Sequence, residues 1–147
     1  MGAELVKKLG IRPGHRLFVR EECMDLLASI QPHLPPNVAV TNQPTREGAH
    51  VILLRPDEEE LDTIFREARE WIVPDGAVWV VVKRKPYRQE GDVSFEAAQA
   101  AALPTGLVDN KECTVSETEY ATRYVLRREL RPKSPEDARR RGGRRNP

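Results

Sequence analysis

The sequence predicts an α/β fold: a doubly wound sheet, mostly parallel, with an antiparallel hairpin at its C-terminal edge. Residues 77–82 form an unbroken apolar run, typical of a strand that helices cover on both faces. Before this run, apolar residues recur at helical spacing over 61–72. After it, two strand-like segments, 107–115 and 121–128, follow each other closely enough to pair. Alternating strands and helices with short connections imply right-handed crossovers and parallel pairing.

The first part of the chain alternates short helices with short strands. Helices are expected over 4–9 and 24–30. Pro32, Pro35 and Pro36 end the second helix, because proline cannot continue the helical hydrogen-bond ladder. Strands are expected over 16–19, 38–41 and 51–54.

The clearest periodic signal lies just before the central apolar run. Asp57 can cap a helix, and Glu58–Glu60 place negative charge where the helix dipole favours it. One apolar face follows, formed by Leu61, Ile64, Phe65, Ala68, Trp71 and Ile72. The helix is expected to end at Ile72, with Pro74-Asp75-Gly76 making a tight turn into the strand.

The remaining aromatic, cysteine and histidine residues have structural interpretations. Ser94 can cap a helix that runs to about Leu103. Trp71 and Trp79 are expected to be packing residues on the helix and in the central strand. Two cysteines, Cys23 and Cys113, match no metal spacing and are expected to behave as small apolar residues. The histidines, His15, His33 and His50, are scattered along the chain, so no metal site is expected.

Length and charge divide the chain into a body and a tail. The 147 residues suffice for one domain with a core, predicted over 1–130, but not comfortably for two. From 131 to 147 almost no apolar residue occurs, which predicts a disordered, arginine-rich tail. Residues 1–122 carry 14 Lys and Arg against 20 Asp and Glu, whereas 123–147 carry 10 against 3. No run approaches the ~20 apolar residues of a membrane helix, and a cytoplasmic protein is expected.

Two short motifs resemble those of class I S-adenosylmethionine-dependent methyltransferases. The segment 9–14, LGIRPG, looks like the Leu-x-x-x-Pro-Gly entry to their first strand. The segment 72–79, IVPDGAVW, is similar to their Leu-x-Pro-Gly-Gly turn into the fifth strand. The resemblance runs in order over roughly 5–128, and it implies a Rossmann-like, methyltransferase-like sheet.

The chain departs from those enzymes where their cofactor binds. Their first strand is followed by a glycine-rich loop, because only glycine lets the backbone approach the cofactor closely. Residues 20–25, REECMD, contain no glycine. Their second strand ends in an acid that holds the ribose hydroxyls, whereas here Thr41 and Asn42 stand at that point. The resemblance therefore implies the fold without its usual cofactor, and no cofactor is expected.

A closer resemblance is to a small bacterial family of unknown function. Its short, methyltransferase-like chains likewise lack the glycine motif. The resemblance rests on Leu9–Ile11 with Pro13-Gly14, Val51–Leu54, Trp79, Lys83–Lys85, Gly106–Asp109 and Thr122–Val125. It implies the fold and supplies no activity.

Basic side chains follow three of the predicted strands. Since the carboxyl ends of parallel strands meet at one edge, where ligands bind in such sheets, these residues form a candidate site. The candidate ligand-binding residues are Arg20, Glu21, Arg55, Lys83, Arg84 and Lys85. They would suit an anionic small molecule, a nucleotide or phosphate. Alternatively, the charges only mark where buried strands meet water, and the arginines are neutralised by nearby acids: Glu21, Glu22, Asp57 and Glu58–Glu60. The sequence favours this second interpretation.

No catalytic constellation is recognisable. Glu21 and Glu22 lack a positioned partner. Cys23 follows the first strand, where a helix N-terminus could lower its pKa, but no base stands beside it. In the tail, Arg139, Arg140, Arg141, Arg144 and Arg145 could bind nucleic-acid phosphates without sequence preference. A solubilising tail, or one that docks on the acidic body, is the alternative.

Three functions are compatible with this sequence. The first is a non-catalytic binding or regulatory protein on a methyltransferase-like scaffold. The second is an enzyme or sensor for an anionic small molecule at the carboxyl ends of the strands. The third is a nucleic-acid-associated protein that works through its arginine-rich tail.

Overall fold

The computed structural model describes residues 2–132 of the chain. The tail arginines proposed to bind nucleic acid lie outside the described residues, so that hypothesis and the predicted disorder of the tail stay predictions. The described helices are α1 (Gly2–Leu9), α2 (Met24–Ile30), α3 (Leu61–Trp71) and α4 (Phe95–Ala102). The strands are β1 (Arg16–Val19), β2 (Ala39–Thr41), β3 (Ala49–Leu54), β4 (Ile72–Lys83), β5 (Leu107–Thr114) and β6 (Glu119–Leu126). None of the helices among residues 2–132 is long and apolar enough to cross a membrane.

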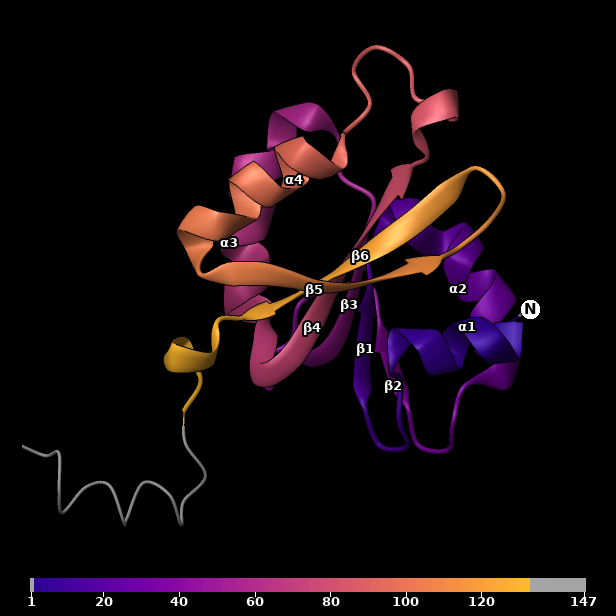
Figure 1. The fold of residues 1–147 in the computed structure, drawn as a ribbon. Helices are drawn as coiled ribbons and strands as arrows, with labels where there is room; N and C mark the ends of the chain where they lie inside the picture. Colours follow the sequence, from indigo (N-terminus) through magenta and orange to yellow (C-terminus); the bar gives the residue numbers. More distant parts are fainter. Residues whose placement is uncertain (1, 133–147) are drawn as a thin grey trace, which may run out of the picture.

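The six strands form one sheet in the order β2-β1-β3-β4-β6-β5 (Figure 1). Strand β1 pairs in parallel with β2 and β3, and β3 pairs in parallel with β4. Strand β6 runs antiparallel to both β4 and β5. This confirms the predicted doubly wound sheet, mostly parallel with an antiparallel hairpin at its C-terminal edge. The reversed strand β6 lies inside the sheet, and β5 forms its edge.

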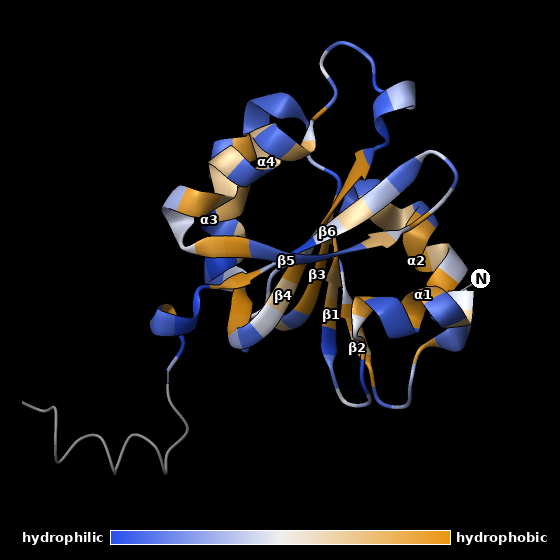
Figure 2. Cartoon of the chain, in the orientation of Figure 1, coloured by the Kyte–Doolittle hydropathy of each residue, from blue (hydrophilic) through white to orange (hydrophobic). Residues whose placement is uncertain are grey.

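Two helices cover each face of the sheet, α1 and α2 on one side and α3 and α4 on the other (Figure 1). The side chains of β4 alternate between these two cores. Val78, Val80 and Val82 face α3 and α4, whereas Trp79 and Val81 face α1 and α2. Figure 2 shows the resulting concentration of apolar residues in the central strands. The unbroken apolar run therefore has the structural meaning expected of a strand covered on both faces.

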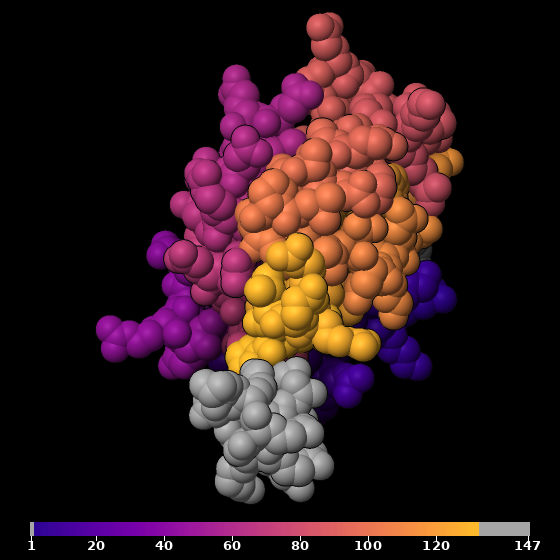
Figure 3. Space-filling view, turned by 60° about the vertical axis from the view of Figure 1, so that its left-hand side comes forward, coloured from indigo at the N-terminus to yellow at the C-terminus, as the bar shows by residue number. Residues whose placement is uncertain are grey.

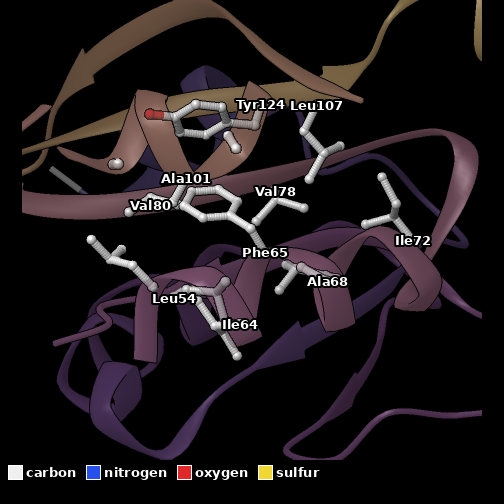
Figure 4. Close-up of a cluster of buried hydrophobic side chains, with 14 of the residues drawn as sticks. Leu54, Ile64, Phe65, Ala68, Ile72, Val78, Val80, Ala101, Leu107 and Tyr124 are labelled. Carbon is white, nitrogen blue, oxygen red and sulfur yellow. The ribbon is translucent and has the colours of Figure 1, made fainter. Parts of the chain in front are cut away.

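The core under α3 is built around aromatic contacts (Figure 4). Phe65 of α3 packs edge-on against Tyr124 of β6, with the ring centroids 5.1 Å apart. Trp71 at the end of α3 packs edge-on against Phe18 of β1, at 5.3 Å. Asp57 and Glu60 form a capping box ahead of α3, in the short 3-10 turn η3 (Glu58–Glu60). The apolar face and the cap predicted for this helix are confirmed.

The start of β4 corrects one sequence-based expectation. Helix α3 ends at Trp71, and β4 begins directly at Ile72 instead of after a separate turn. Ala49 of β3 pairs with Ile72, and Val51 pairs with Ala77. Between these two pairs, the chain advances by two residues along β3 and by five residues along β4. The Pro-Asp-Gly segment therefore forms a bulge of three extra residues within β4. The buried Ile72 side chain explains why pairing begins before the bulge.

Gly76 is required where this bulge meets β3. A Cβ atom at Gly76 would lie 2.9 Å from the carbonyl oxygen of Ala49 and 3.0 Å from that of His50. Both atoms belong to the neighbouring backbone and cannot rotate away. The glycine allows this close approach and thereby fixes the position of Asp75 at the beginning of the parallel pairing.

The last described segment turns back at the same end of the sheet, where β6 ends and β5 begins. After β6, the 3-10 turn η6 (Arg128–Leu130) places Leu130 against Gly106, at the start of β5. Arg131 donates through Nε to the carbonyl oxygen of Leu126 at 2.9 Å. Figure 3 shows this yellow segment lying beside the orange segment that contains α4.

Candidate functional site

The predicted basic residues do not share one pocket, although Arg55 and Arg84 both line a pocket of about 910 Å³ beside α1 and α2. Arg20, Arg55 and Lys83, which follow or end β1, β3 and β4, line a pocket of about 370 Å³, the carboxyl-edge pocket. Arg84 and Lys85 line a larger pocket of about 890 Å³ beside the β5–β6 hairpin, the hairpin pocket. The sixth predicted residue, Glu21, is exposed in the 3-10 turn η1 (Glu21–Cys23) and lines neither pocket.

Arg55 is the centre of the carboxyl-edge pocket, and every N–H of its guanidinium has a partner. Its Nε and Nη2 donate to the two carboxylate oxygens of Glu119, both at 2.9 Å. Its Nη1 donates to the backbone carbonyl of Glu22 at 2.6 Å and to Asp25 at 2.9 Å. Nη2 also donates to Asp25, at 3.3 Å. These contacts use all five N–H donors of an arginine.

Arg20 extends the same network toward α3. Its Nε donates to Glu22 at 2.7 Å, and its Nη2 donates to Glu60 at 2.6 Å. The Glu22 carboxylate also accepts the backbone N–H of Arg55 at 3.1 Å, which links the two arginines. At the far side of the pocket, Lys83 pairs with Asp92 at 3.2 Å. Each basic residue predicted to line this pocket therefore has a carboxylate partner.

The pKa shifts agree with these contacts. Burial alone would lower the pKa of Arg55, but its hydrogen bonds to Asp25 and Glu119 raise it overall. Burial opposes the charge of Arg20 in the same way, and the hydrogen bond to Glu60 raises its pKa. The hydrogen bond from Arg55 lowers the pKa of Asp25. The contacts thus favour the charged forms of Arg20, Asp25 and Arg55.

These ion pairs match the interpretation in which acidic neighbours neutralise the arginines. Sequence reasoning named Glu22 and Glu60 as such neighbours, but it missed Asp25, Asp92 and Glu119 as partners. No local sequence signal identifies Glu119, because it is 64 residues from Arg55 and reaches this site through the pairing of β6 with β4. Binding of an anionic ligand by Arg20 and Arg55 stays a prediction, and an anion would have to compete with carboxylates already in place.

The hairpin pocket differs because its arginines keep unused donors. Arg84 donates through Nη2 to the Thr114 hydroxyl at 3.0 Å, and Arg88 donates through Nη2 to the Lys83 carbonyl at 3.1 Å. The Nε atoms of both arginines are buried and have no hydrogen-bond partner among residues 2–132. Tyr120 also lines this pocket, and burial raises the pKa of its hydroxyl.

The cysteines are packing residues. Cys23 is fully buried in the core beneath α1 and α2, and burial raises the pKa of its thiol to about 12. The short turn after β1 therefore does not activate Cys23 as a nucleophile. Cys113 is also buried, and burial raises its pKa as well.

Two histidines that look scattered in the sequence stack on each other. The rings of His15 and His50 lie 4.5 Å apart, with only 5° between their planes. His15 precedes β1 and His50 lies at the start of β3, and these strands are parallel neighbours. The two histidines are thus far apart along the chain but are neighbours in space. The predicted parallel topology was the signal that could have placed them together, since the amino ends of such strands share an edge.

The strand order and the reversed strand define a methyltransferase-like Rossmann fold, which comparison with solved structures supports. The pyocyanin biosynthetic protein PhzM is similar over 86% of this chain and 54% of its own, with a TM-score of 0.63 and 12% identity. The mitomycin 7-O-methyltransferase MmcR is similar over 86% of this chain and 53% of its own, with a TM-score of 0.59 and 12% identity. A putative type 11 methyltransferase from Sulfolobus solfataricus is similar over 89% of this chain and 91% of its own, with a TM-score of 0.59 and 9% identity.

These likenesses concern the fold alone. The chain spans about half the length of PhzM and of MmcR. No protein-family model matches the chain, and no curated protein matches its sequence. The resemblance to methyltransferases is therefore confirmed for the fold, and the finer resemblance to a small bacterial family stays a prediction.

Proposed function

We propose that this protein is a non-catalytic binding or regulatory protein, built on a methyltransferase-like scaffold that does not take S-adenosylmethionine in the usual manner. The segment directly after β1 carries this proposal. Where the methyltransferase resemblance would require a glycine-rich loop, residues 20–25 supply Arg20, Glu22 and Asp25 to the ion-pair network. The backbone is held by these side chains, and none of the six residues offers the close approach that glycine allows.

The end of β2 supports the same proposal. A pocket between β1 and β2 is lined by Val19, Met24, Leu27, Val40, Thr41 and Asn42. Its volume of about 220 Å³ lies below the ~300–1,000 Å³ of most small-molecule sites. It contains no carboxylate to hold ribose hydroxyls. Neither recognition element that the resemblance calls for is supplied by these residues.

Titration with S-adenosylmethionine tests this function. We expect no saturable heat of binding at millimolar cofactor, because the glycine loop and the acid after β2 are both absent from the sequence. A functional class I methyltransferase titrated under the same conditions is the control. A saturable isotherm with micromolar affinity would contradict the proposal.

A second candidate function is the binding of an anionic small molecule in the hairpin pocket. The buried Nε–H groups of Arg84 and Arg88 favour it, because a buried donor without a partner is unfavourable and an anionic oxygen would satisfy it. If ATP stabilises the protein in a thermal-shift assay, Arg88→Gln is expected to weaken its apparent affinity about tenfold or more. Unchanged ATP affinity in this variant would exclude the hairpin pocket as the site.

A further inference from the structure

Another pocket lies at the opposite edge of the sheet, where β1 and β3 begin (lower edge in Figure 1). This amino-edge pocket has a volume of about 420 Å³. The cationic side chains that line it are Lys7, Lys8, Arg12, Lys111 and Arg123. They come from α1, from the loop after it, and from β5 and β6. Segments that are far apart in the sequence thus bring five positive charges to one concave surface.

These cations are not neutralised as those of the carboxyl-edge pocket are. Within residues 2–132, none of the five forms an ion pair with a carboxylate within 4.0 Å. The amino-edge pocket contains a single acidic side chain, Asp75, which the bulge in β4 presents. Mutual repulsion of cations around a hollow disfavours the empty state, and an anion of more than one charge would relieve it.

Arg123 is the least exposed of the five cationic side chains in the amino-edge pocket. Its guanidinium is half-buried, and burial lowers its pKa, with a smaller contribution from the neighbouring charge of Arg131. Its side chain donates to the amide oxygen of Asn110 at 3.3 Å, a neutral and long contact. A partly buried guanidinium without a carboxylate is unfavourable in isolation. An anion is the partner that this arrangement lacks.

The stacked histidines supply neutral donors to the same pocket. The backbone N–H of Arg12 donates to Nδ1 of His15 at 3.1 Å. The backbone N–H of Arg16 donates to Nδ1 of His50 at 2.8 Å. Because each Nδ1 accepts a hydrogen bond, the neutral rings carry their proton on Nε2. Both rings line the pocket, so each neutral ring has an Nε2–H group that is not used by these two hydrogen bonds.

We propose that the amino-edge pocket binds the phosphate group of a phosphorylated small molecule, held by Arg12, Arg123 and Lys111 with donors from the histidine pair. A phosphate monoester carries up to two negative charges and several acceptor oxygens, which suits a set of cationic and N–H donors. The volume lies within the ~300–1,000 Å³ of small-molecule sites. A concave pocket of this size, with two stacked rings in its wall, favours a discrete ligand over the extended backbone of a nucleic acid.

This inference does not depend on the function proposed above. The carboxyl-edge and hairpin pockets are at other parts of the sheet, although Lys8 and Lys111 also line the hairpin pocket. Arg123, His15 and His50 line the amino-edge pocket and neither of the others. Variants of these three residues therefore separate the two proposals.

The test is a titration of the full-length protein with inorganic phosphate and phenyl phosphate at constant ionic strength, followed by amide spectra. We expect saturable shifts at Gly10, His15, His50 and Ala77. Arg123→Gln is expected to raise the apparent dissociation constant about tenfold or more, because it removes a charge-assisted contact. The control Arg66→Gln removes the same charge from an exposed position on α3 and should leave binding unchanged.

Stability without phosphate provides a second readout. Because the Arg123 guanidinium is half-buried and has no carboxylate partner among residues 2–132, Arg123→Gln should melt at the same temperature as the wild type or higher. The wild type should gain thermal stability on adding phosphate, by mass action, while the variant gains much less. A variant that unfolds easily without ligand would show a structural role for Arg123 and overturn its assignment to the site.

Sulfate tests the histidine pair, since its own charge does not change near neutral pH. Burial lowers the pKa of both rings, and for His15 the neighbours His50, Arg12 and Arg16 lower it further, while Asp75 opposes. For His50, Arg16 lowers the pKa and Asp75 opposes. A bound dianion would favour protonated rings, so sulfate should bind more tightly as pH falls toward the lowered pKa values of the two rings. His50→Gln should weaken this pH dependence.

Three results would overturn the proposal. The first is the absence of saturable shifts with either phosphate compound. The second is an equal loss of binding in Arg123→Gln and Arg66→Gln, which would indicate general charge attraction. The third is tight, strongly salt-dependent binding of a single-stranded oligonucleotide without saturable binding of phenyl phosphate, which would make this face a nucleic-acid interface.

Discussion

Replacing Arg55 with methionine is expected to lower the free energy of unfolding by about 2–4 kcal/mol. The substitution removes five hydrogen bonds at once and leaves the carboxylates of Asp25 and Glu119 without their cation. Glu119 is the more costly of the two, because its side chain is only 17% exposed. Urea denaturation followed by tryptophan fluorescence measures the loss.

Two companion variants separate the network from general effects of charge. Arg66→Met removes an exposed guanidinium from α3 and should change stability by less than ~0.5 kcal/mol. Combining Arg55→Met with Glu119→Gln should recover part of the loss, because the second change removes the uncompensated negative charge. If Arg55→Met is no less stable than Arg66→Met, the network does not stabilise the fold.

The same network gives the wild type a specific sensitivity to acid. Arg55 lowers the pKa of Asp25 in the folded state, so the folded protein binds fewer protons there than the unfolded chain. That contribution is fully present above the ordinary aspartate pKa of about 3.9, and it is lost as pH falls through the lower, folded value. Arg55→Met removes the shift, so its stability should fall less steeply below about pH 4.

The fold was predictable because its signals are local. The bounds of β1 and α2 follow from short apolar patterns between turn residues, and both elements lie where the sequence places them. The apolar face of α3 and its Asp57 cap are likewise local. The start of β4 could not be predicted from local sequence, because it depends on the pairing of Ile72 with Ala49 of another strand. The sequence Pro-Asp-Gly is compatible both with a tight turn and with a bulge of several residues.

The candidate sites were predictable only in part, because they depend on contacts between residues that are far apart in the sequence. Parallel crossovers place Arg20, Arg55 and Lys83 around one pocket, and this follows from topology alone. The carboxylates that pair with these residues do not follow from the topology, since Glu119 lies 64 residues from Arg55 along the chain. The stacked histidines belong to an intermediate case. Once β1 and β3 are known to be parallel neighbours, their first residues must lie at the same end of the sheet. His15 and His50 are then expected to lie close together.

Replacing Trp79 with alanine is expected to have the largest effect on stability, a loss of about 3–5 kcal/mol. The side chain is fully buried in the core beneath α1, and its Nε1 donates to the carbonyl oxygen of Leu9 at 3.0 Å. Leu9 ends α1, where helix carbonyls have no partner within the helix. Trp79→Phe keeps much of the packing but leaves this carbonyl unpaired, so a smaller loss of about 1–3 kcal/mol is expected. Urea denaturation measured by circular dichroism compares both variants with the wild type. Equal losses in the two would show that the indole hydrogen bond, and not the filled volume, anchors α1 to β4.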